Sequence, residues 1–152
     1  MSLGPLTYKT PSPVSNLSVD LTNSEGCGIC LDGQYNVTLA TAPNKVPYGT
    51  VVVGANSTDG SGIGQIAAGA LEVIDAVGCV AQVKASTTGS IFAGDFVLID
   101  TTDANGTFVS TDNQTPVAGN WIWGLALTDC AAGEQFLYRF QPYIVQYVAP
   151  TP

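Results

Sequence analysis

The stretch of sequence that decides the fold reads Ala93-Gly-Asp-Phe-Val-Leu-Ile99, an Asn105-Gly106 pair, Trp121-Ile-Trp-Gly-Leu-Ala-Leu-Thr128 and Ala131-Ala-Gly-Glu-Gln-Phe-Leu137. Its apolar runs are short, and each is bounded by residues that favour turns. Glycine adopts positive φ without a steric penalty, and an aspartate that follows it can hydrogen-bond its own backbone two residues on. The pattern predicts short antiparallel strands in a small barrel or sandwich. Its turn residues need no catalytic role to explain them.

Alternating apolar and polar residues extend the same prediction over the rest of the chain. The expected strands cover residues 34–42, 46–54, 71–84, 91–100, 107–111, 121–128, 135–141 and 143–148. Gly78 is expected to divide or kink the third of these ranges, 71–84. Residues 63–71 could form one short helix, although two glycines weaken it. The chain is therefore predicted to be an all-β protein, a small antiparallel barrel with at most one short helix.

The first 19 residues differ from the remainder, because three of them are prolines. Proline fixes φ and holds the preceding residue in extended geometry, so this segment cannot be a helix. We interpret residues 1–19 as an extended arm and residues 20–152 as a single β-barrel domain. Leu3, Leu6 and Tyr8 are the apolar residues with which the arm would hold a partner. A disordered terminus is the alternative.

Two of the expected strands carry apolar residues on faces that a single barrel does not cover. Residues 96–99 are apolar on both faces. In residues 121–128, strict alternation places the bulky side chains on one face and Ile122, Gly124, Ala126 and Thr128 on the other. A second layer, either a loop or another subunit, is then required. The candidate subunit-interface residues are Phe96, Leu98, Ile122 and Ala126.

The composition narrows the range of functions. Of the 152 residues, only 11% are charged, and the formal net charge is −8. Four scattered cations form no basic patch, so binding to nucleic acid or to an anionic membrane surface is not expected. No run is long enough to span a membrane, and residues 1–20 contain no apolar signal-peptide segment. A surface poor in charge suits a protein that docks against other subunits, and we expect assembly in a cytoplasm.

The four cysteines permit more than one interpretation. Cys27 and Cys30 have the spacing of metal ligands or of a redox pair, but they lie in a glycine-rich segment. Cys79 and Cys130 are isolated, and the chain has no histidine, so a zinc site would lack its usual second pair of ligands. Free buried or half-buried thiols are favoured over a disulfide and over zinc.

Residues with catalytic potential are few. Nucleophilic catalysis by serine or cysteine usually needs a histidine base. Residues 101–112 approach the spacing of a calcium loop, although an Asn-Gly hairpin turn explains them without a metal. Trp121 and Trp123 could stack on sugars, but core packing is the simpler role. No carboxylate pair is singled out for sugar hydrolysis. We therefore predict that the protein is not an enzyme and uses no cofactor.

The order of motifs in residues 93–137 resembles the head-decoration, or cement, proteins of tailed bacteriophages. The shared elements are Ala-Gly-Asp followed by an apolar strand, a long hairpin, the Gly124-to-Thr128 strand and Ala-Ala-Gly-Glu. A Pro47-Tyr-Gly-Thr-Val-Val52 run extends the likeness weakly upstream. The resemblance implies a compact barrel, or "tulip", that trimerises on the capsid surface. It further implies a structural virion protein that binds major capsid protein at three-fold positions. A phage fibre domain or a carbohydrate-binding β-domain is the alternative.

Overall fold

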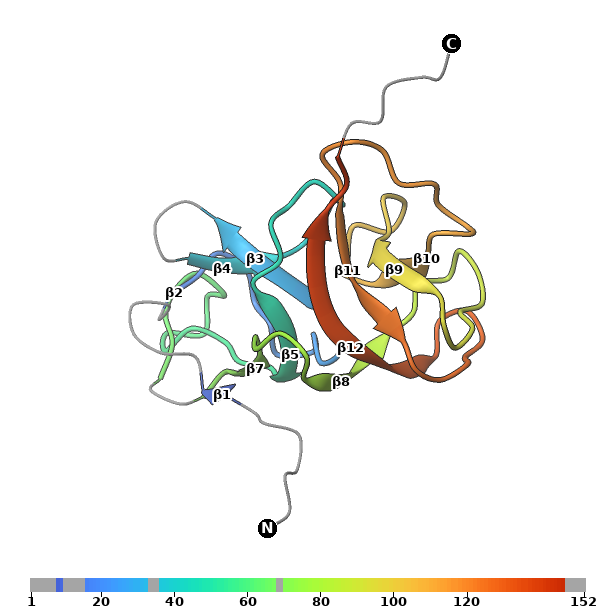
Figure 1. The fold of residues 1–152 in the computed structure, drawn as a ribbon. Coiled ribbons are helices and arrows are strands. Elements are labelled where there is room, and N and C mark those ends of the chain that lie inside the picture. The colour runs from blue at the N-terminus through green and yellow to red at the C-terminus, as the bar shows by residue number, and fades with distance from the viewer. Residues whose placement is uncertain (1–7, 10–15, 33–35, 68–69, 147–152) are drawn as a thin grey trace.

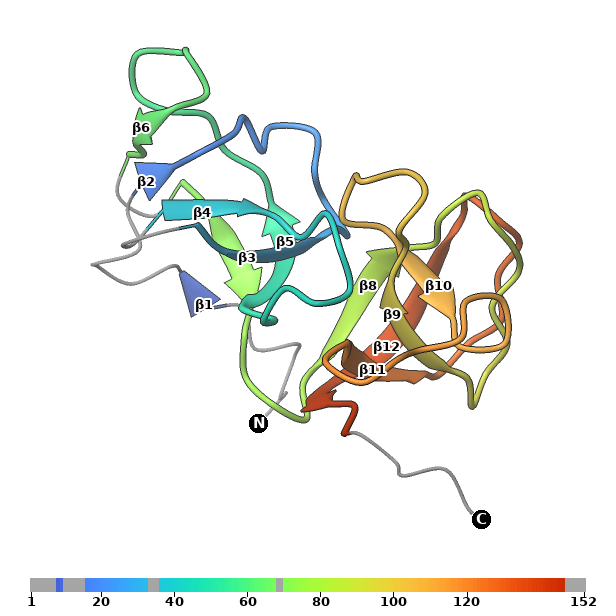
Figure 2. The same cartoon turned by 90° about the horizontal axis from the view of Figure 1, so that it is seen from above.

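A computed structural model describes residues 8–9, 16–32, 36–67 and 70–146. These residues form twelve β-strands in two sheets and no helix, which confirms the all-β prediction. The sheets lie side by side (Figure 1), and a view at right angles shows the same arrangement (Figure 2). No helix in the described part of the chain has the length and apolar character needed to cross a membrane.

The first sheet has seven strands, mostly from the N-terminal half of the chain. Their spatial order is β1 (Tyr8–Lys9), β7 (Glu72–Ile74), β5 (Gly49–Val53), β3 (Gly28–Asp32), β4 (Asn36–Leu39), β2 (Asn16–Leu17) and β6 (Gly64–Gln65). Only β2 and β4 pair in parallel. A cluster of fully buried aliphatic residues packs on this sheet, with Leu17, Ile29, Val37 and Val73 among its members.

The second sheet has five antiparallel strands. Their order is β10 (Phe108–Ser110), β9 (Phe96–Ile99), β11 (Trp121–Ala126), β12 (Gln135–Ile144) and β8 (Val80–Lys84). The two ends of this sheet meet, because Ala85, directly after β8, forms a parallel bridge with Phe108 of β10. The second sheet is therefore curled into a barrel-like half-cylinder.

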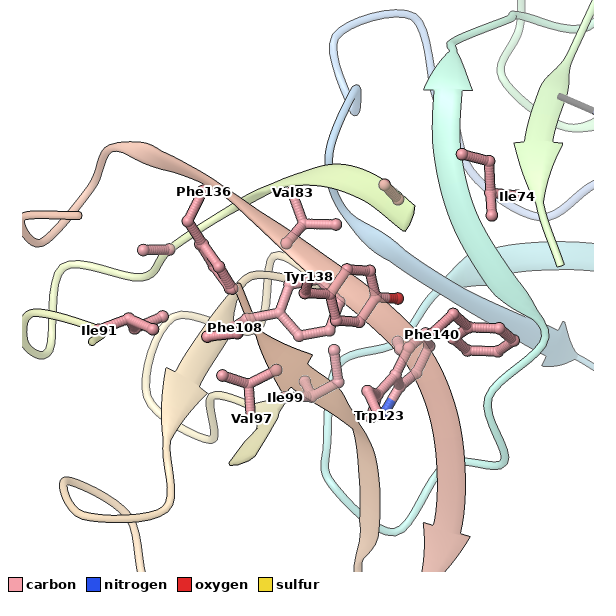
Figure 3. Packing of buried hydrophobic residues seen from close by; sticks show 14 of the residues in the cluster. Ile74, Val83, Ile91, Val97, Ile99, Phe108, Trp123, Phe136, Tyr138 and Phe140 are labelled. Atoms are coloured by element: carbon pink, nitrogen blue, oxygen red, sulfur yellow. The ribbon is translucent and has the colours of Figure 1, made fainter. Parts of the chain in front are cut away.

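Aromatic side chains fill the curled sheet. Phe108, Trp123 and Tyr138 are fully buried, and the Phe108 ring meets Trp123 edge to face and Tyr138 at a tilt. Figure 3 shows these rings pointing into one interior, with Ile74 entering from the other sheet. Gly28 of β3 lies against Trp123, since an added Cβ there would be 2.9 Å from the indole ring. The two sheets thus share part of one core.

The structure refines the predicted strands in three places. The segment 71–84 contains two strands that join different sheets, and Gly78, with φ of 91°, lies in the turn between them. The predicted runs 135–141 and 143–148 belong largely to one strand, β12. In place of the optional helix at 63–71, the described residues form β6 and a bridge between Ser57 and Ile66.

The predicted boundary of the arm at residue 19 is wrong. Leu17 is fully buried in the first core, and β2 pairs with both β4 and β6. The backbone of Tyr8 pairs with Val73 of the same chain, so β1 covers the edge of β7. Leu3 and Leu6 lie outside the described residues.

Candidate functional site

The second sheet carries exposed apolar side chains on its outer face. Along β12 the side chains alternate between the buried aromatic core and the outside. The same alternation in β8 turns Gln82 and Lys84 outward. We define the outer face as Val80, Gln82, Lys84, Phe96, Leu125, Leu127, Gln135, Leu137, Arg139 and Tyr143.

Strand register aligns these residues into rows across the sheet. Phe96 pairs with Leu125, and Leu125 pairs with Arg139. Arg139 in turn pairs with Val80, so this row crosses four strands. The side chains of residues that pair across antiparallel strands lie on the same face and contact one another.

Three large apolar side chains on this face are exposed. Phe96 is 46% exposed, Leu137 is 40% exposed and Tyr143 is 46% exposed. The rings of Phe96 and Tyr143 meet edge to face, with centroids 6.2 Å apart and an interplanar angle of 88°. Packing between the two rings fixes their orientation before any partner arrives, which lowers the entropy lost on binding.

Two of the four predicted interface residues, Leu98 and Ile122, are covered by their own chain. Both are fully buried in a small cluster with Val109, and Val145 packs on it. The loop that contains Asn120 holds Val145 by a backbone hydrogen bond of 2.8 Å. The polypeptide itself therefore supplies a second layer over Leu98 and Ile122.

Ala126 is also buried, but in the aromatic core with Tyr138. Strict alternation along residues 121–128 had placed it on the face opposite Trp123. The pairing of β11 with β12 shifts register between Ile122 and Gly124, and such a bulge changes the direction of the side chains that follow. The predicted grouping of faces is therefore wrong, and of the four candidates only Phe96 is exposed.

The charge on the outer face differs from that of the whole chain. Arg139 and Lys84 are two of the four cations of the protein, and both are exposed. Neither forms an ion pair with a carboxylate of the described residues. Arg139 lies between Leu125 and Val80 in its row, and Leu137 precedes it by two residues on β12. Arg139 is therefore an exposed cation flanked by apolar residues, and it can pair with a carboxylate of another molecule.

The acidic loop after β9 is organised by its own hydrogen bonds. The carboxylate of Asp100, fully buried, accepts hydrogen bonds from the backbone and hydroxyl of Thr102 and from the hydroxyl of Thr88. Burial acts to raise the pKa of Asp100, but hydrogen bonds from Ser86, Thr102 and Thr88 hold it below its ordinary value. Asp103 accepts hydrogen bonds from the Asn105 backbone and the Thr107 hydroxyl. These carboxylates stabilise the turn between β9 and β10.

Burial of Cys27 and Cys30 determines how readily their thiols ionise. Cys27 and Cys30 are buried free thiols, and Cys30 belongs to β3, a strand that the sequence did not predict. Burial raises the pKa of both thiols, that of Cys27 to about 11, although Lys84 acts against this shift. Among the described residues, no group of three or more histidine, cysteine, aspartate or glutamate side chains could hold a metal ion.

The two tryptophans proposed for sugar stacking differ in exposure. Trp123 is fully buried and contacts Phe108 and Phe140, so its faces are occupied. Trp121 is half-buried and packs against the same core. Trp123 is therefore a core residue, and it is too buried to stack on a sugar.

The sequence has no match among models of known protein families, and no curated protein resembles it closely enough to be a relative.

Proposed function

We propose that this chain is a structural virion protein that decorates the outside of a bacteriophage head. In this proposal it binds the major capsid protein at three-fold positions as a homotrimer, after assembly in the host cytoplasm. The observation that carries the proposal is the outer face of the second sheet, where two aromatic side chains and one leucine are exposed beside an unpaired arginine. A surface of this composition is typical of protein–protein contacts.

Composition and sequence pattern support the same function. Only 11% of the residues are charged, which suits a protein that spends its functional life against other subunits. The motifs at 93–137 resemble those of decoration proteins, and in this chain they build the curled sheet itself. Gly94, with φ of 95°, and Gly133, with φ of 79°, form the turns that precede β9 and β12.

The N-terminal segment contributes a second contact in this proposal. In this proposal Leu3, Leu6 and Tyr8 contact the neighbouring capsid protein. β1 begins at the edge of the first sheet, and an edge strand presents backbone groups that another chain can pair with. Deletion of residues 2–7 is expected to weaken attachment without changing the fold.

Co-sedimentation with undecorated heads tests the function. Purified protein is mixed with heads of the phage that encodes it, and the amount that sediments is compared with the amount of capsid protein. Decoration predicts saturable binding at a copy number that scales with the number of three-fold positions. The variant Phe96→Ser should bind more weakly, because it removes an aromatic side chain from the outer face. Val46→Ser, which changes an exposed apolar residue in the loop between β4 and β5, is the control. Absence of binding, or binding at only a few sites per head, would contradict the proposal.

A further inference from the structure

We infer that the outer face of the second sheet is one half of a head-to-tail contact between copies of this chain, in which Arg139 receives a carboxylate from the next copy. The inference rests on the proposed homotrimer and specifies which surface forms it and with what polarity.

The position of Arg139 is the first step. Its strand, β12, is flanked by β11 and β8, so Arg139 lies in the interior of the sheet and not at an edge. Its cross-strand neighbours are Leu125 and Val80, both half-buried. Arginine and aromatic residues are enriched where interfaces exclude water, and such an arginine contributes most when it meets a carboxylate there. Within the described residues Arg139 has no such partner.

The charge of the chain identifies the partner. The outer face carries Lys84 and Arg139 and no acidic residue. The remainder of the molecule has only Lys9 and Lys45 against all 12 acidic residues. The rest of the chain is therefore acidic on average, and a second copy offers the negative charge that this face lacks. Complementary potentials of this kind specify which surfaces meet.

Charge also determines whether the two copies meet face to face or head to tail. If two outer faces met in a two-fold dimer, two copies of Arg139 and Lys84 would be enclosed in one apolar interface. Like charges brought together in a desolvated contact cost several kcal/mol. A head-to-tail contact avoids this, because the cationic face of one copy meets the acidic surface of the next. Repetition of such a contact closes a ring when the rotation allows it.

The size of the face fits this role. Four strands about 4.8 Å apart, with lengths of 4, 6, 10 and 5 residues at about 3.4 Å per residue, define a surface on the order of 400 Å². A stable interface buries about 800 Å² on each partner. The outer face can therefore supply about half of one side of the contact, with the remainder supplied by adjoining loops.

Charge reversal at Arg139 tests the inference. The mass of full-length protein is measured by analytical ultracentrifugation over a range of concentrations for the wild type, Arg139→Glu, Arg139→Leu and Lys45→Glu. Arg139→Glu is expected to raise the dissociation constant at least about thirtyfold, because the enclosed charge pair becomes a repulsion. Lys45→Glu, which makes the same change at an exposed cation elsewhere, should leave it unchanged. Higher salt should weaken the wild type more than Arg139→Leu.

Each alternative result has a defined meaning. If Arg139→Leu associates more tightly than the wild type, the contact is face to face and the inferred polarity is wrong. If Arg139→Glu, shown by circular dichroism to be folded, associates like the wild type, the outer face is not the contact. A wild type that stays monomeric at every concentration also overturns the inference. That result would also contradict the proposed homotrimer, whereas the decoration of heads itself is decided separately by co-sedimentation.

Discussion

Burial shifts the ionisation of individual residues in this protein, and Cys27 is the clearest example. It is buried where β3 begins, and burial raises its pKa to about 11 from an ordinary value of 9.0. Cys30, on the same strand, and Cys130, half-buried before β12, are shifted in the same direction, again chiefly by burial. All three thiols are therefore disfavoured as thiolates in the folded protein.

This shift predicts how stability depends on alkaline pH. Below pH 9 the Cys27 thiol is protonated in both the folded and the unfolded chain, so its contribution to stability is fully present. Between about pH 9 and 11 the unfolded chain loses the proton more readily, so the free energy of unfolding should fall. Urea unfolding at a series of pH values measures the fall. It should be shallower for Cys27→Ala, and equal slopes for the two proteins would contradict the burial of this thiol.

Gly124 is fixed by a different constraint, the closeness of a neighbouring backbone. An added Cβ would lie 2.0 Å from the carbonyl oxygen of Arg139, which cannot move without breaking the pairing of β11 with β12. Gly124→Ala is therefore expected to destabilise the fold by about 1–3 kcal/mol or more.

Gly60→Ala provides the comparison for this prediction. At Gly60 no atom lies within 4 Å of the added Cβ, and the cost is only that of a φ of 77°, about 1–2 kcal/mol. Chemical denaturation of both variants decides the matter. A loss at Gly124 no greater than that at Gly60 would show that the two strands are less closely packed than described.

At the scale of elements, short apolar runs were predictable because local alternation and turn residues specify them. The strand at 135–140 follows from side chains that alternate between the core and the exterior. The strands at 96–99 and 108–110 follow from short runs of mostly apolar residues. The direction of Ala126 was not predictable, because the register shift that decides it depends on β12, a strand distant in sequence. The strand β3 was missed because Gly28 and Cys30 continue a glycine-rich segment that resembled a turn.

The burial of Leu17, which the sequence had assigned to the arm, predicts how much that residue stabilises the fold. Leu17 of β2 is fully buried in the first core, whereas Leu31 of β3 is 47% exposed on the same sheet. Leu17→Ala should destabilise the protein by about 2–5 kcal/mol through the lost burial and the cavity left behind. Leu31→Ala should cost under about 1 kcal/mol. If thermal unfolding shows equal effects, residues 16–19 belong to an arm after all.

For the molecule as a whole, the alternating runs and turn residues indicated an all-β domain, but they did not indicate its division into two sheets. That division depends on long-range pairings, such as the bond from Gln82 Nε2 to Gln135 Oε1 across 53 residues. Local patterns carry no information about which distant strands meet. Of the outer face, the sequence therefore predicted only Phe96. Arg139 and Tyr143 belong to this face because strand pairing places Arg139 beside Leu125 and the Tyr143 ring against Phe96.

The central claim is that this protein binds the outside of a phage head at three-fold positions. Electron cryo-microscopy of heads incubated with purified protein, compared with heads alone, measures this most directly. The account predicts added density on the outer surface at every three-fold position, with three-fold symmetry and a size that matches three copies of this chain. Unchanged heads at saturating protein, or added density confined to a tail or to a single vertex, would contradict it.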